Sequence, residues 1–377
     1  MRFYLIAGEP SGDALGAALM AGLKELLPDV EFSGVGGPLM QAQGLHSQFP
    51  MDELSVMGLA EVLPKYRALK RRIAECAETV LAQKPDALIT IDSPDFCLRV
   101  AKIVKAQSNT RTIHYVAPSV WAWREGRAAK MARVIDHVLA LLPFEPPLMQ
   151  AAGMGCDFVG HPVVAEPQAT PDQAQDFRTR YGLNDAPLLL ALPGSRRGEV
   201  TRLTPVFGQT IGQLHNERPN LHIVLPAAPS VAARVRELVT DWPIPPLVLD
   251  AANLSEKRAA FAAADVALAA SGTVSLELAA ANTPMVITYD MNWLSRILIG
   301  RMLKVDTVTL VNLVSETRVV PEFLGKNCVP DKIAHGVLGV LSNPQNQQQA
   351  MALTMKRLGR DQEPPGLRAA RAVLQAL

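Results

Sequence analysis

The sequence lacks paired cysteines and an excess of charge of either sign. Its four cysteines, Cys76, Cys97, Cys156 and Cys328, form no C-x-x-C pair, so we expect isolated buried thiols of a reducing compartment and no zinc site. The chain has 37 lysine and arginine residues against 36 aspartate and glutamate residues, for a formal net charge of +1. A nucleic-acid-binding surface normally needs a clear excess of basic residues, so no nucleic acid is expected as a partner.

Long apolar segments are also absent. No stretch offers the ~18 uninterrupted apolar residues of a membrane-spanning helix, and the first apolar strand follows directly after Met1 without a basic and apolar leader. We therefore expect no secretory signal and a cytoplasmic location, while attachment to a membrane surface stays open. Hydrophobic residues nevertheless make up 49% of the 377 residues, enough for the cores of two domains.

Strands and helices alternate over the first part of the chain. Segments such as DALITI (86–91) and HVLALL (137–142) are apolar almost throughout, as strands covered on both faces are. The alternation predicts a mostly parallel, doubly wound sheet. We expect strands at 3–7, 30–35, 86–91, 110–116 and 135–141, and helices at 14–27, 67–83, 97–107, 126–133 and 145–152.

A change of composition precedes a second part with the same alternation. Residues 160–187 are rich in proline, glutamine and alanine, which is typical of an interdomain connection. The fold class is therefore α/β, with two Rossmann-like doubly wound domains, 1–165 and 166–345, facing a central cleft that suits a ligand. In the second domain we expect strands at 188–192, 221–225, 246–250, 265–269 and 284–288, and helices at 199–215, 229–240, 255–263 and 273–281.

A helical segment, 346–377, ends the chain. In LRAARAVLQAL one apolar stripe is formed by Leu367, Ala370, Val373, Leu374 and Leu377. Such a stripe needs a partner, so we expect this segment to pack on the first domain or on another chain.

A glycine turn in the second domain has the features of a phosphate site. In LALPGSRRGEV (190–200) a strand leads through the turn into a helix. The N–H groups of a helix N-terminus together with an adjacent guanidinium suit phosphate oxygens, and Arg196 or Arg197 can supply that group. The alternative is a solvated turn with surface arginines.

A second turn follows the strand that ends near Ala270. Ser271, Gly272 and Thr273 predict a tight turn with a capping hydroxyl at the start of a helix. Glu277 lies about one helical turn further along the same face, where its carboxylate can accept from the ribose of a nucleotide whose diphosphate sits at the helix start. An N-capped core helix with one exposed glutamate is the alternative. The two turns together favour a nucleotide site.

In the first domain, ITIDSPDFCLRV (89–100) puts Asp92 at the end of a buried strand. A carboxylate there faces the ligand edge of the sheet and can accept the proton of a hydroxyl nucleophile. The alternative is that Asp92 only caps the next turn, because Asp-Ser-Pro is ordinary turn chemistry. The spacing from Asp92 to Asp95 is a poor match for a divalent metal, so no metal is expected.

The segment TIHYVAPSVWAWREGR (112–127) concentrates aromatic residues after a strand. Trp121 and Trp123 lie in the expected loop, where aromatic faces, hydroxyls and a guanidinium suit a sugar or an acyl-sugar. An aromatic cluster closing the edge of the sheet is the alternative. His114 lies inside the strand, which favours a hydrogen-bonded core histidine over a ligand contact.

Two stretches, 52–72 and 291–305, combine apolar and basic residues. The first contains the apolar residues Val56, Met57, Leu59, Ala60, Val62 and Leu63, and the basic residues Lys65, Arg67, Lys70, Arg71 and Arg72. This combination is typical of an element that lies on an anionic membrane surface, and the alternative is a core-packed helix with a solvated basic end. Its occurrence twice favours a lipid-like partner.

Eight motifs fall in an order that closely resembles the lipid-A-disaccharide synthase family. They are GEPSGD (8–13), VMGLAEVL (56–63), IDSPDF (91–96), HYVAPSVWAW (114–123), LPFE (142–145), GHP (160–162), LPGSRRGEV (192–200) and ASGTVSLE (270–277). The resemblance covers residues 1 to about 315, and a set of this kind is highly specific.

The resemblance implies a GT-B fold and an inverting glycosyltransferase of lipid A biosynthesis that uses neither metal nor cofactor. The family condenses UDP-2,3-diacylglucosamine with 2,3-diacylglucosamine 1-phosphate to the β-1,6-linked disaccharide and UDP. It works at the cytoplasmic face of the inner membrane of Gram-negative bacteria, which implies peripheral binding to an anionic membrane surface. A homodimer with exchanged C-terminal segments is known in the family, so a dimer is one expected assembly.

The resemblance also carries roles to particular positions. Asp92 resembles the essential acidic residue of the family, and Arg196 resembles its essential arginine, with Ser195 in the same turn. Glu277 and Asn312 resemble residues that contact UDP.

The GEPSGD motif has the strand–turn–helix form of a phosphate cradle but a different residue pattern. Its glycines recur every four residues rather than as G-x-G-x-x-G, and Glu9 and Asp13 would repel a diphosphate. We therefore expect 8–13 to face sugar hydroxyls, with Ser11 and the N–H of Gly12 as donors and Glu9 as acceptor. Asp13 is expected to cap the start of its own helix.

Two other interpretations stay open from the sequence. One is another GT-B enzyme, such as a UDP-N-acetylglucosamine 2-epimerase or a transferase for a soluble acceptor. The two apolar and basic stretches, 52–72 and 291–305, argue against this interpretation. The other is a non-catalytic sugar-nucleotide sensor or membrane scaffold, which needs no base at Asp92.

Overall fold

The computed structural model describes residues 1–377 except 55–58, 123–125, 184 and 291–304, and it describes the backbone alone for 59–65. The chain divides into two compact units, Met1–Ala165 with Leu358–Leu377, and Glu166–Arg357. Several side chains named above therefore lie outside the described residues: Val56, Met57, Leu59, Val62, Leu63 and Trp123, together with nearly all of 291–305.

The first unit is built on a parallel sheet in which the described residues form seven strands, in the order β3-β2-β1-β4-β5-β6-β7. This is the doubly wound order, with its reversal between β1 and β4. Every residue of β4 and β6 is buried, as their unbroken apolar sequences predict. The strands are β1 (Arg2–Ala7), β2 (Glu31–Val35), β3 (His46–Ser47), β4 (Ala87–Ile91), β5 (Arg111–Tyr115), β6 (His137–Ala140) and β7 (Gly155–Phe158).

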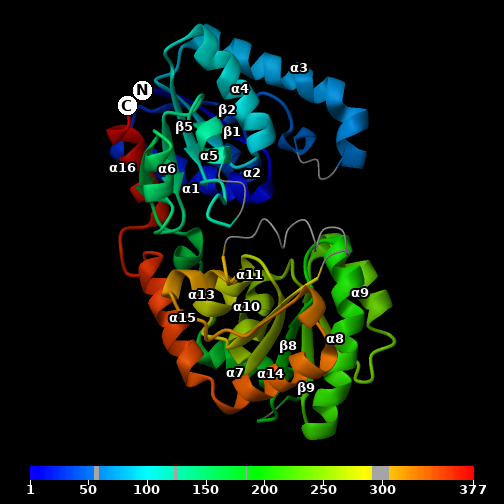
Figure 1. Cartoon of the computed structure of the whole chain (residues 1–377). Coiled ribbons are helices and arrows are strands. Elements are labelled where there is room, and N and C mark those ends of the chain that lie inside the picture. Colours follow the sequence, from blue (N-terminus) through cyan, green and yellow to red (C-terminus); the bar gives the residue numbers. More distant parts are fainter. Residues whose placement is uncertain (55–58, 123–125, 184, 291–304) are drawn as a thin grey trace. The chain divides into compact units, whose positions relative to one another are not determined.

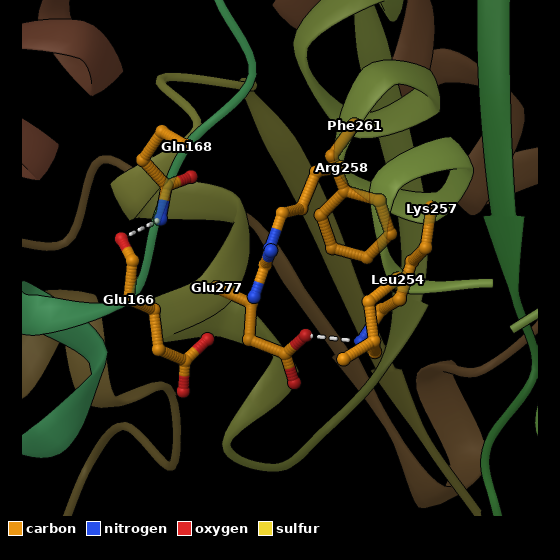
Figure 2. Close-up of a pocket in the computed structure, with 7 residues that line it drawn as sticks. All are labelled: Glu166, Gln168, Leu254, Lys257, Arg258, Phe261 and Glu277. Carbon is orange, nitrogen blue, oxygen red and sulfur yellow. Dashed lines mark hydrogen bonds and ion pairs between the residues drawn. The ribbon is translucent and has the colours of Figure 1, made fainter. Parts of the chain in front are cut away.

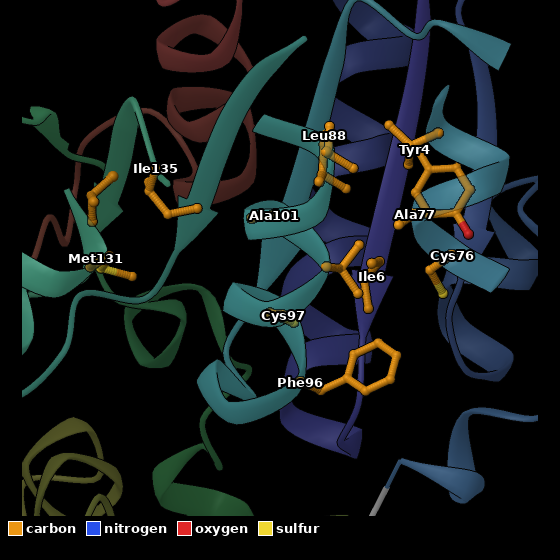
Figure 3. Close-up of a cluster of buried hydrophobic side chains, with 14 of the residues drawn as sticks. Tyr4, Ile6, Cys76, Ala77, Leu88, Phe96, Cys97, Ala101, Met131 and Ile135 are labelled. Carbon is orange, nitrogen blue, oxygen red and sulfur yellow. The ribbon is translucent and has the colours of Figure 1, made fainter. Parts of the chain in front are cut away.

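Helices cover both faces of this sheet, since side chains on β1 alternate between two cores. Tyr4 and Ile6 contribute to one core with side chains of α3 and α4, including Cys76 and Cys97 (Figure 3). Phe3 and its alternating neighbours contribute to the other core, with α1 and α16. The helices are α1 (Pro10–Leu26), α2 (Pro38–Ala42), α3 (Leu59–Gln83), α4 (Pro94–Gln107), α5 (Gly126–Met131), α6 (Pro146–Ala151) and α16 (Pro365–Gln375), with 3₁₀ turns at Met51–Glu53 and Pro162–Ala165.

The C-terminal helix α16 packs on α1 of its own chain (Figure 1). The helices approach closely because Gly22 and Gly366 face each other, and a Cβ on Gly22 would lie 2.7 Å from the Gly366 carbonyl oxygen. Arg368 Nη2 donates to the Phe158 carbonyl over 2.8 Å. Ala370 and Val373 of the expected stripe are therefore buried in the first unit, one of the two partners expected for it, whereas Leu377 stays 44% exposed.

The second unit repeats the architecture with six strands among its described residues, in the order β10-β9-β8-β11-β12-β13. Every residue of β8 and β11 is buried, and the two strands pair in parallel with Leu192 opposite Ala269. The strands are β8 (Leu188–Leu192), β9 (His222–Ala227), β10 (Leu247–Asp250), β11 (Val266–Ala270), β12 (Met285–Tyr289) and β13 (Glu322–Leu324). The helices are α7 (Pro171–Arg180), α8 (Arg197–Glu217), α9 (Ala232–Leu238), α10 (Leu254–Ala263), α11 (Val274–Ala280), α13 (Leu310–Ser315), α14 (Pro330–Ser342) and α15 (Gln345–Arg357), with 3₁₀ turns at Pro229–Val231 and Gly325–Asn327.

The structure differs from the sequence-based expectation in two segments. The supposed connection 160–187 contains α7, whose first turn is closed by a capping box between Thr170 and Gln173. The segment 346–377 is divided, because α15 packs on α11 and α13 of the second unit whereas α16 belongs to the first. Among the described residues no helix is long and apolar enough to cross a membrane.

Candidate active site

A cavity of about 370 Å³ opens at the carboxyl ends of the strands of the second unit. It lies where the strand order reverses between β8 and β11, the usual ligand position of such a sheet. Six of the residues proposed from the sequence line it together: Ser195, Arg196, Ser271, Gly272, Thr273 and Glu277. The structure thus gathers into one site two turns that lie more than seventy residues apart in the chain.

The first of these turns is shaped by Gly194. This residue has φ +118, and a Cβ on it would lie 2.7 Å from the Glu199 Cβ, so only glycine fits without displacement. Arg196 then precedes the first residue of α8, and its Nη1 lies 3.3 Å from the Glu199 Oε1. The Arg196 side chain is 68% exposed, which leaves the guanidinium accessible to an anion.

The second turn lines the same cavity in a geometry that differs from the expectation. Ser271 N–H donates to the Thr288 carbonyl over 2.8 Å, which ties the turn to β12. The capping hydroxyl expected somewhere in this turn is absent at the N-cap position, because Thr273 has helical backbone angles and its side chain makes no capping hydrogen bond. Ser275 instead donates to the Gly272 carbonyl over 2.9 Å, and Thr273 is an exposed residue of the cavity lining.

Glu277 is paired with a residue that the sequence analysis did not identify. Lys257 Nζ on α10 donates to Glu277 Oε2, and Figure 2 shows the two side chains meeting beside Phe261. Lys257 and Phe261 line the cavity as well. No local pattern marks Lys257 in the sequence, because its role depends on a carboxylate twenty residues away.

Asn312 is not placed to contact a ligand in this structure. Its side chain is 1% exposed, donates to Thr307 Oγ1 and the Val320 carbonyl, and accepts from the Val320 N–H. These bonds use both ends of the amide to hold the segment after α13. The expected UDP contact is therefore corrected to a structural role.

In the first unit, unusual backbone geometry surrounds Asp92. Asp92 and Ser93 have φ of +50 and +44, and Val116, after the neighbouring strand β5, has φ +87. Left-handed conformations at residues other than glycine cost roughly 1–3 kcal/mol each and cluster at functional sites. The Asp92 N–H donates to the Tyr115 carbonyl over 3.0 Å, so the strand end is fixed while the Asp92 side chain stays half-buried.

The GEPSGD motif lies next to this strand end, but much of it is helix rather than turn. Helix α1 begins at Pro10, four residues earlier than expected, with Glu9 as its N-cap. Ser11 is exposed in the first turn, whereas Gly12 is buried against Ile91. The motif and Asp92 thus both lie at the reversal between β1 and β4.

Asp13 has a different role from the one expected. Its carboxylate is 3% exposed and accepts from the N–H groups of Gly37, Leu39 and Met40. It therefore caps the N-terminus of α2, not the start of its own helix.

The aromatic loop is attached to a buried carboxyl group. Trp121 Nε1 donates to Glu145 Oε1 over 3.3 Å, and the Leu142 N–H donates to Glu145 Oε2 over 3.0 Å. The Trp121 ring also meets Phe144 edge to face, with centroids 5.5 Å apart. Burial raises the pKa of Glu145 to about 7. The LPFE motif, which includes Glu145, was used only for the family resemblance, and no residue of it was assigned a role.

His114 is a core residue and not part of that loop. Its ring is 2% exposed, and Nδ1 lies 2.7 Å from Thr90 Oγ1. Burial lowers the pKa of His114 to about 4, so the ring is neutral at pH 7. This outcome agrees with the interpretation of His114 as a hydrogen-bonded core histidine and removes it from the residues of this segment that could contact an acceptor.

The basic part of the first apolar and basic stretch is exposed on α3. Arg67, Lys70 and Arg71 face solvent, whereas Arg72 is bound by Glu53 and Glu75. Arg71 also forms an ion pair with Glu75 over 3.4 Å, so Arg67 and Lys70 are the more accessible cations of this segment. Among the described residues no group of three histidine, cysteine or acidic side chains could hold a metal ion.

Solved structures with the same architecture have little sequence identity to the chain. The UDP-GlcNAc 2-epimerase from Neisseria meningitidis, solved bound to UDP-GlcNAc, aligns with a TM-score of 0.63 at 11% identity, covering 100% of this chain and 99% of that one. MurG from Acinetobacter baumannii aligns with a TM-score of 0.57 at 15% identity, with the same coverage. These likenesses show the GT-B fold, with its two Rossmann-like units.

Sequence comparisons are far more specific. The family model described as lipid-A-disaccharide synthetase matches residues 3–374. A lipid-A-disaccharide synthase from Ruegeria pomeroyi is 63% identical over 383 aligned positions, covering 100% of this chain and 96% of the relative. One from Rhodospirillum centenum is 48% identical, covering 100% and 95%. The chain therefore belongs to the lipid-A-disaccharide synthase family of glycosyltransferases.

Proposed function

We propose that the chain transfers the diacylglucosaminyl group of UDP-2,3-diacylglucosamine to the 6-hydroxyl of 2,3-diacylglucosamine 1-phosphate. The products are the β-1,6-linked lipid A disaccharide 1-phosphate and UDP. One observation supports this most: six residues proposed from sequence for a UDP-sugar line a single cavity at the reversal point of the second sheet.

In this proposal the cavity holds the UDP group. The exposed Arg196 guanidinium and the backbone N–H groups near Gly272 stabilise the negative charge that grows on the diphosphate as it leaves. Loss of one such donor typically costs about 3 kcal/mol of transition-state stabilisation. Glu277 accepts from the ribose hydroxyls, a known use of an acid near the diphosphate in this kind of fold.

Asp92 acts as the general base. It takes the proton of the acceptor 6-hydroxyl, the hydroxyl oxygen attacks the anomeric carbon, and the bond from that carbon to the diphosphate oxygen breaks. The electron pair of the broken bond leaves with UDP, and the configuration at the anomeric carbon is inverted. The strained backbone at Asp92 and Ser93 supports a functional position for this side chain.

The other exposed groups near this edge of the first sheet bind sugar hydroxyls. Ser11 and Glu9 lie at the N-terminus of α1, and Trp121 offers an aromatic face held by Glu145. Aromatic faces and hydroxyl-binding side chains suit an acyl-sugar, so we assign these residues to the acceptor.

The acyl chains of both substrates require a lipid surface, and the family resemblance implies that this surface is the cytoplasmic face of the inner membrane. The exposed cations Arg67, Lys70 and Arg71 support peripheral binding, because each basic residue near an anionic surface contributes about 1 kcal/mol. A homodimer stays a prediction of the family resemblance. Because α16 packs on α1 within the chain, Ala370 and Val373 of its apolar stripe are buried without a second copy.

The test is to incubate the purified protein with both acyl-sugars and analyse the products by mass spectrometry. We expect equal amounts of disaccharide 1-phosphate and UDP, with a β anomeric signal by NMR, and higher turnover on vesicles that contain anionic lipid. Recovery of unchanged acceptor, or of an epimerised UDP-sugar, would contradict the proposal.

A further inference from the structure

Lys257 and Glu277, together with Phe261, line two cavities of the second unit. Both residues line the large cavity of about 370 Å³. Both also line a smaller one of about 50 Å³, with Glu166, Gln168, Leu254, Arg258 and Phe261 (Figure 2). Lys257 lies on α10 and Glu277 on α11, so two separate helices must keep their positions for the pair to form.

The pair uses one carboxylate oxygen and leaves the other available. Lys257 Nζ donates to Glu277 Oε2, and no described residue donates to Oε1. The Lys257 side chain is 25% exposed and that of Glu277 33% exposed, so the pair is partly shielded from water. The Lys257 Nζ also lies 5.2 Å from the centre of the Phe261 ring, so the ammonium group has a second favourable contact beside Glu277.

The Lys257–Glu277 pair also changes the charge of the cavity. A nucleoside diphosphate and Glu277 are both anionic, and a lone carboxylate in the cavity would repel the ligand. The Lys257 ammonium offsets that charge at the point where the carboxylate is needed. Arg196 is the other cationic side chain on the described lining of this cavity, and it stands at the opposite turn, so it cannot orient Glu277.

We propose that Lys257 is a positioning residue for nucleotide recognition, which fixes Glu277 so that Oε1 accepts from the ribose hydroxyls. The inference rests on the proposed function, because it takes the ligand of the cavity to be a uridine nucleotide. It predicts that Lys257 contributes to affinity mainly through the ribose.

The experiment compares the affinity of the full-length protein for UDP and for 2′,3′-dideoxy-UDP by calorimetry. Wild type is expected to prefer UDP by at least about tenfold, the size expected for hydrogen bonds to a charged group. Lys257→Met should reduce that preference to about twofold, as Glu277→Gln should. Arg236→Met removes the same charge from the exposed face of α9, away from both cavities, and should keep the full preference.

The conservative variant separates positioning from simple loss of charge or of fold. Lys257→Arg keeps a cationic partner for Glu277 and is expected to retain the preference within about threefold of wild type. Circular dichroism checks folding, and Lys257→Gln serves the same test if the methionine variant is unstable.

Three results would overturn the inference. The first is an unchanged preference in Lys257→Met with both affinities kept, the second is an unchanged preference with both affinities lowered equally, and the third is an arginine variant no better than the methionine variant. A wild-type protein that binds UDP without preferring it over the dideoxy form would refute the ribose contact and leave the transferase activity standing. Failure of wild type to bind UDP at all would refute the proposed function itself.

Discussion

Asp13 and Met40, 27 residues apart, are joined by a buried hydrogen bond of 2.9 Å from the Met40 N–H to Asp13 Oδ1. Two further N–H groups of the α2 N-terminus donate to the same carboxylate. Asp13→Ala leaves these donors without a partner, so we expect the free energy of unfolding to fall by about 3 kcal/mol. Chemical denaturation followed by circular dichroism measures the change.

Asp95→Ala is the matched control for this prediction. Asp95 also lies in the first turn of a helix of the first unit but is exposed, so its loss should change stability far less. Equal effects of the two substitutions would mean that the cap on α2 contributes nothing specific.

Glu145 makes stability depend on pH. Because burial raises its pKa from 4.5 to about 7, the folded state holds a proton that the unfolded state loses as pH rises through this range. The free energy of unfolding should therefore fall between pH 4.5 and 7 by up to about 3 kcal/mol from this group, and stay level above pH 7.

Glu145→Gln removes that contribution, and the difference between the two proteins isolates it. Urea denaturation at several pH values should show wild type losing stability relative to the glutamine variant from pH 4.5 to 7. Effects of His114, common to both proteins, cancel in the difference. A difference that does not vary with pH would show that Glu145 is ionised throughout this range in the folded protein.

Gly194 is expected to be essential for the shape of the nucleotide site. Gly194→Ala places a Cβ at φ +118 and against Glu199, so it should displace the turn and weaken UDP binding by about tenfold or more. Gly198→Ala, four residues later in α8, meets no atom within 4 Å and should preserve UDP binding and add up to about 1 kcal/mol of stability. Calorimetry measures the UDP affinity of both variants. Similar affinities would show that the shape of the turn at Gly194 does not matter for UDP binding.

Arg196 should matter for binding and not for stability. Its side chain is largely exposed, so Arg196→Ala should leave thermal unfolding unchanged while the UDP dissociation constant rises about 10–100-fold. Arg197, the next residue, is exposed and does not line the cavity. Arg197→Ala should therefore bind UDP nearly as tightly as wild type does. If Arg197→Ala weakens UDP binding more than Arg196→Ala, the phosphate contact belongs to Arg197 and the proposed role of Arg196 is wrong.

Much of the fold, and six residues that line the large cavity, could be predicted from local sequence signals. The strand at 188–192 was predicted with the bounds that the structure gives it, because a buried parallel strand is a continuous apolar run with turn residues at its ends. Ser195, Arg196 and the turn at Gly272 were found for the same reason, since each follows such a strand directly. Helix α7 was missed although Thr170, Pro171 and Gln173 form a recognisable helix start, because the composition around them indicated a linker.

The rest depended on contacts between distant residues. Asp13 was assigned to its own helix since a sequence gives no distance to Gly37 and Met40. Lys257 has no signal apart from Glu277. Asn312 was assigned to UDP from the family resemblance alone, and nothing in the local sequence shows that Thr307 and Val320 use its amide. The sequence therefore identifies polar residues that directly follow a strand, whereas the hydrogen-bond partners of polar residues are known only from the folded chain.

We expect Asp92 of the first unit to supply the base for transfer from a UDP-sugar bound in the cavity of the second unit. The most direct measurement is kcat for disaccharide formation by Asp92→Asn and Asp92→Ala, with UDP affinity determined on the same preparations. We predict that kcat falls about 10²–10⁴-fold in both variants, as expected for loss of a general base, while the UDP dissociation constant changes less than about twofold. Near-normal turnover in both variants would contradict the account.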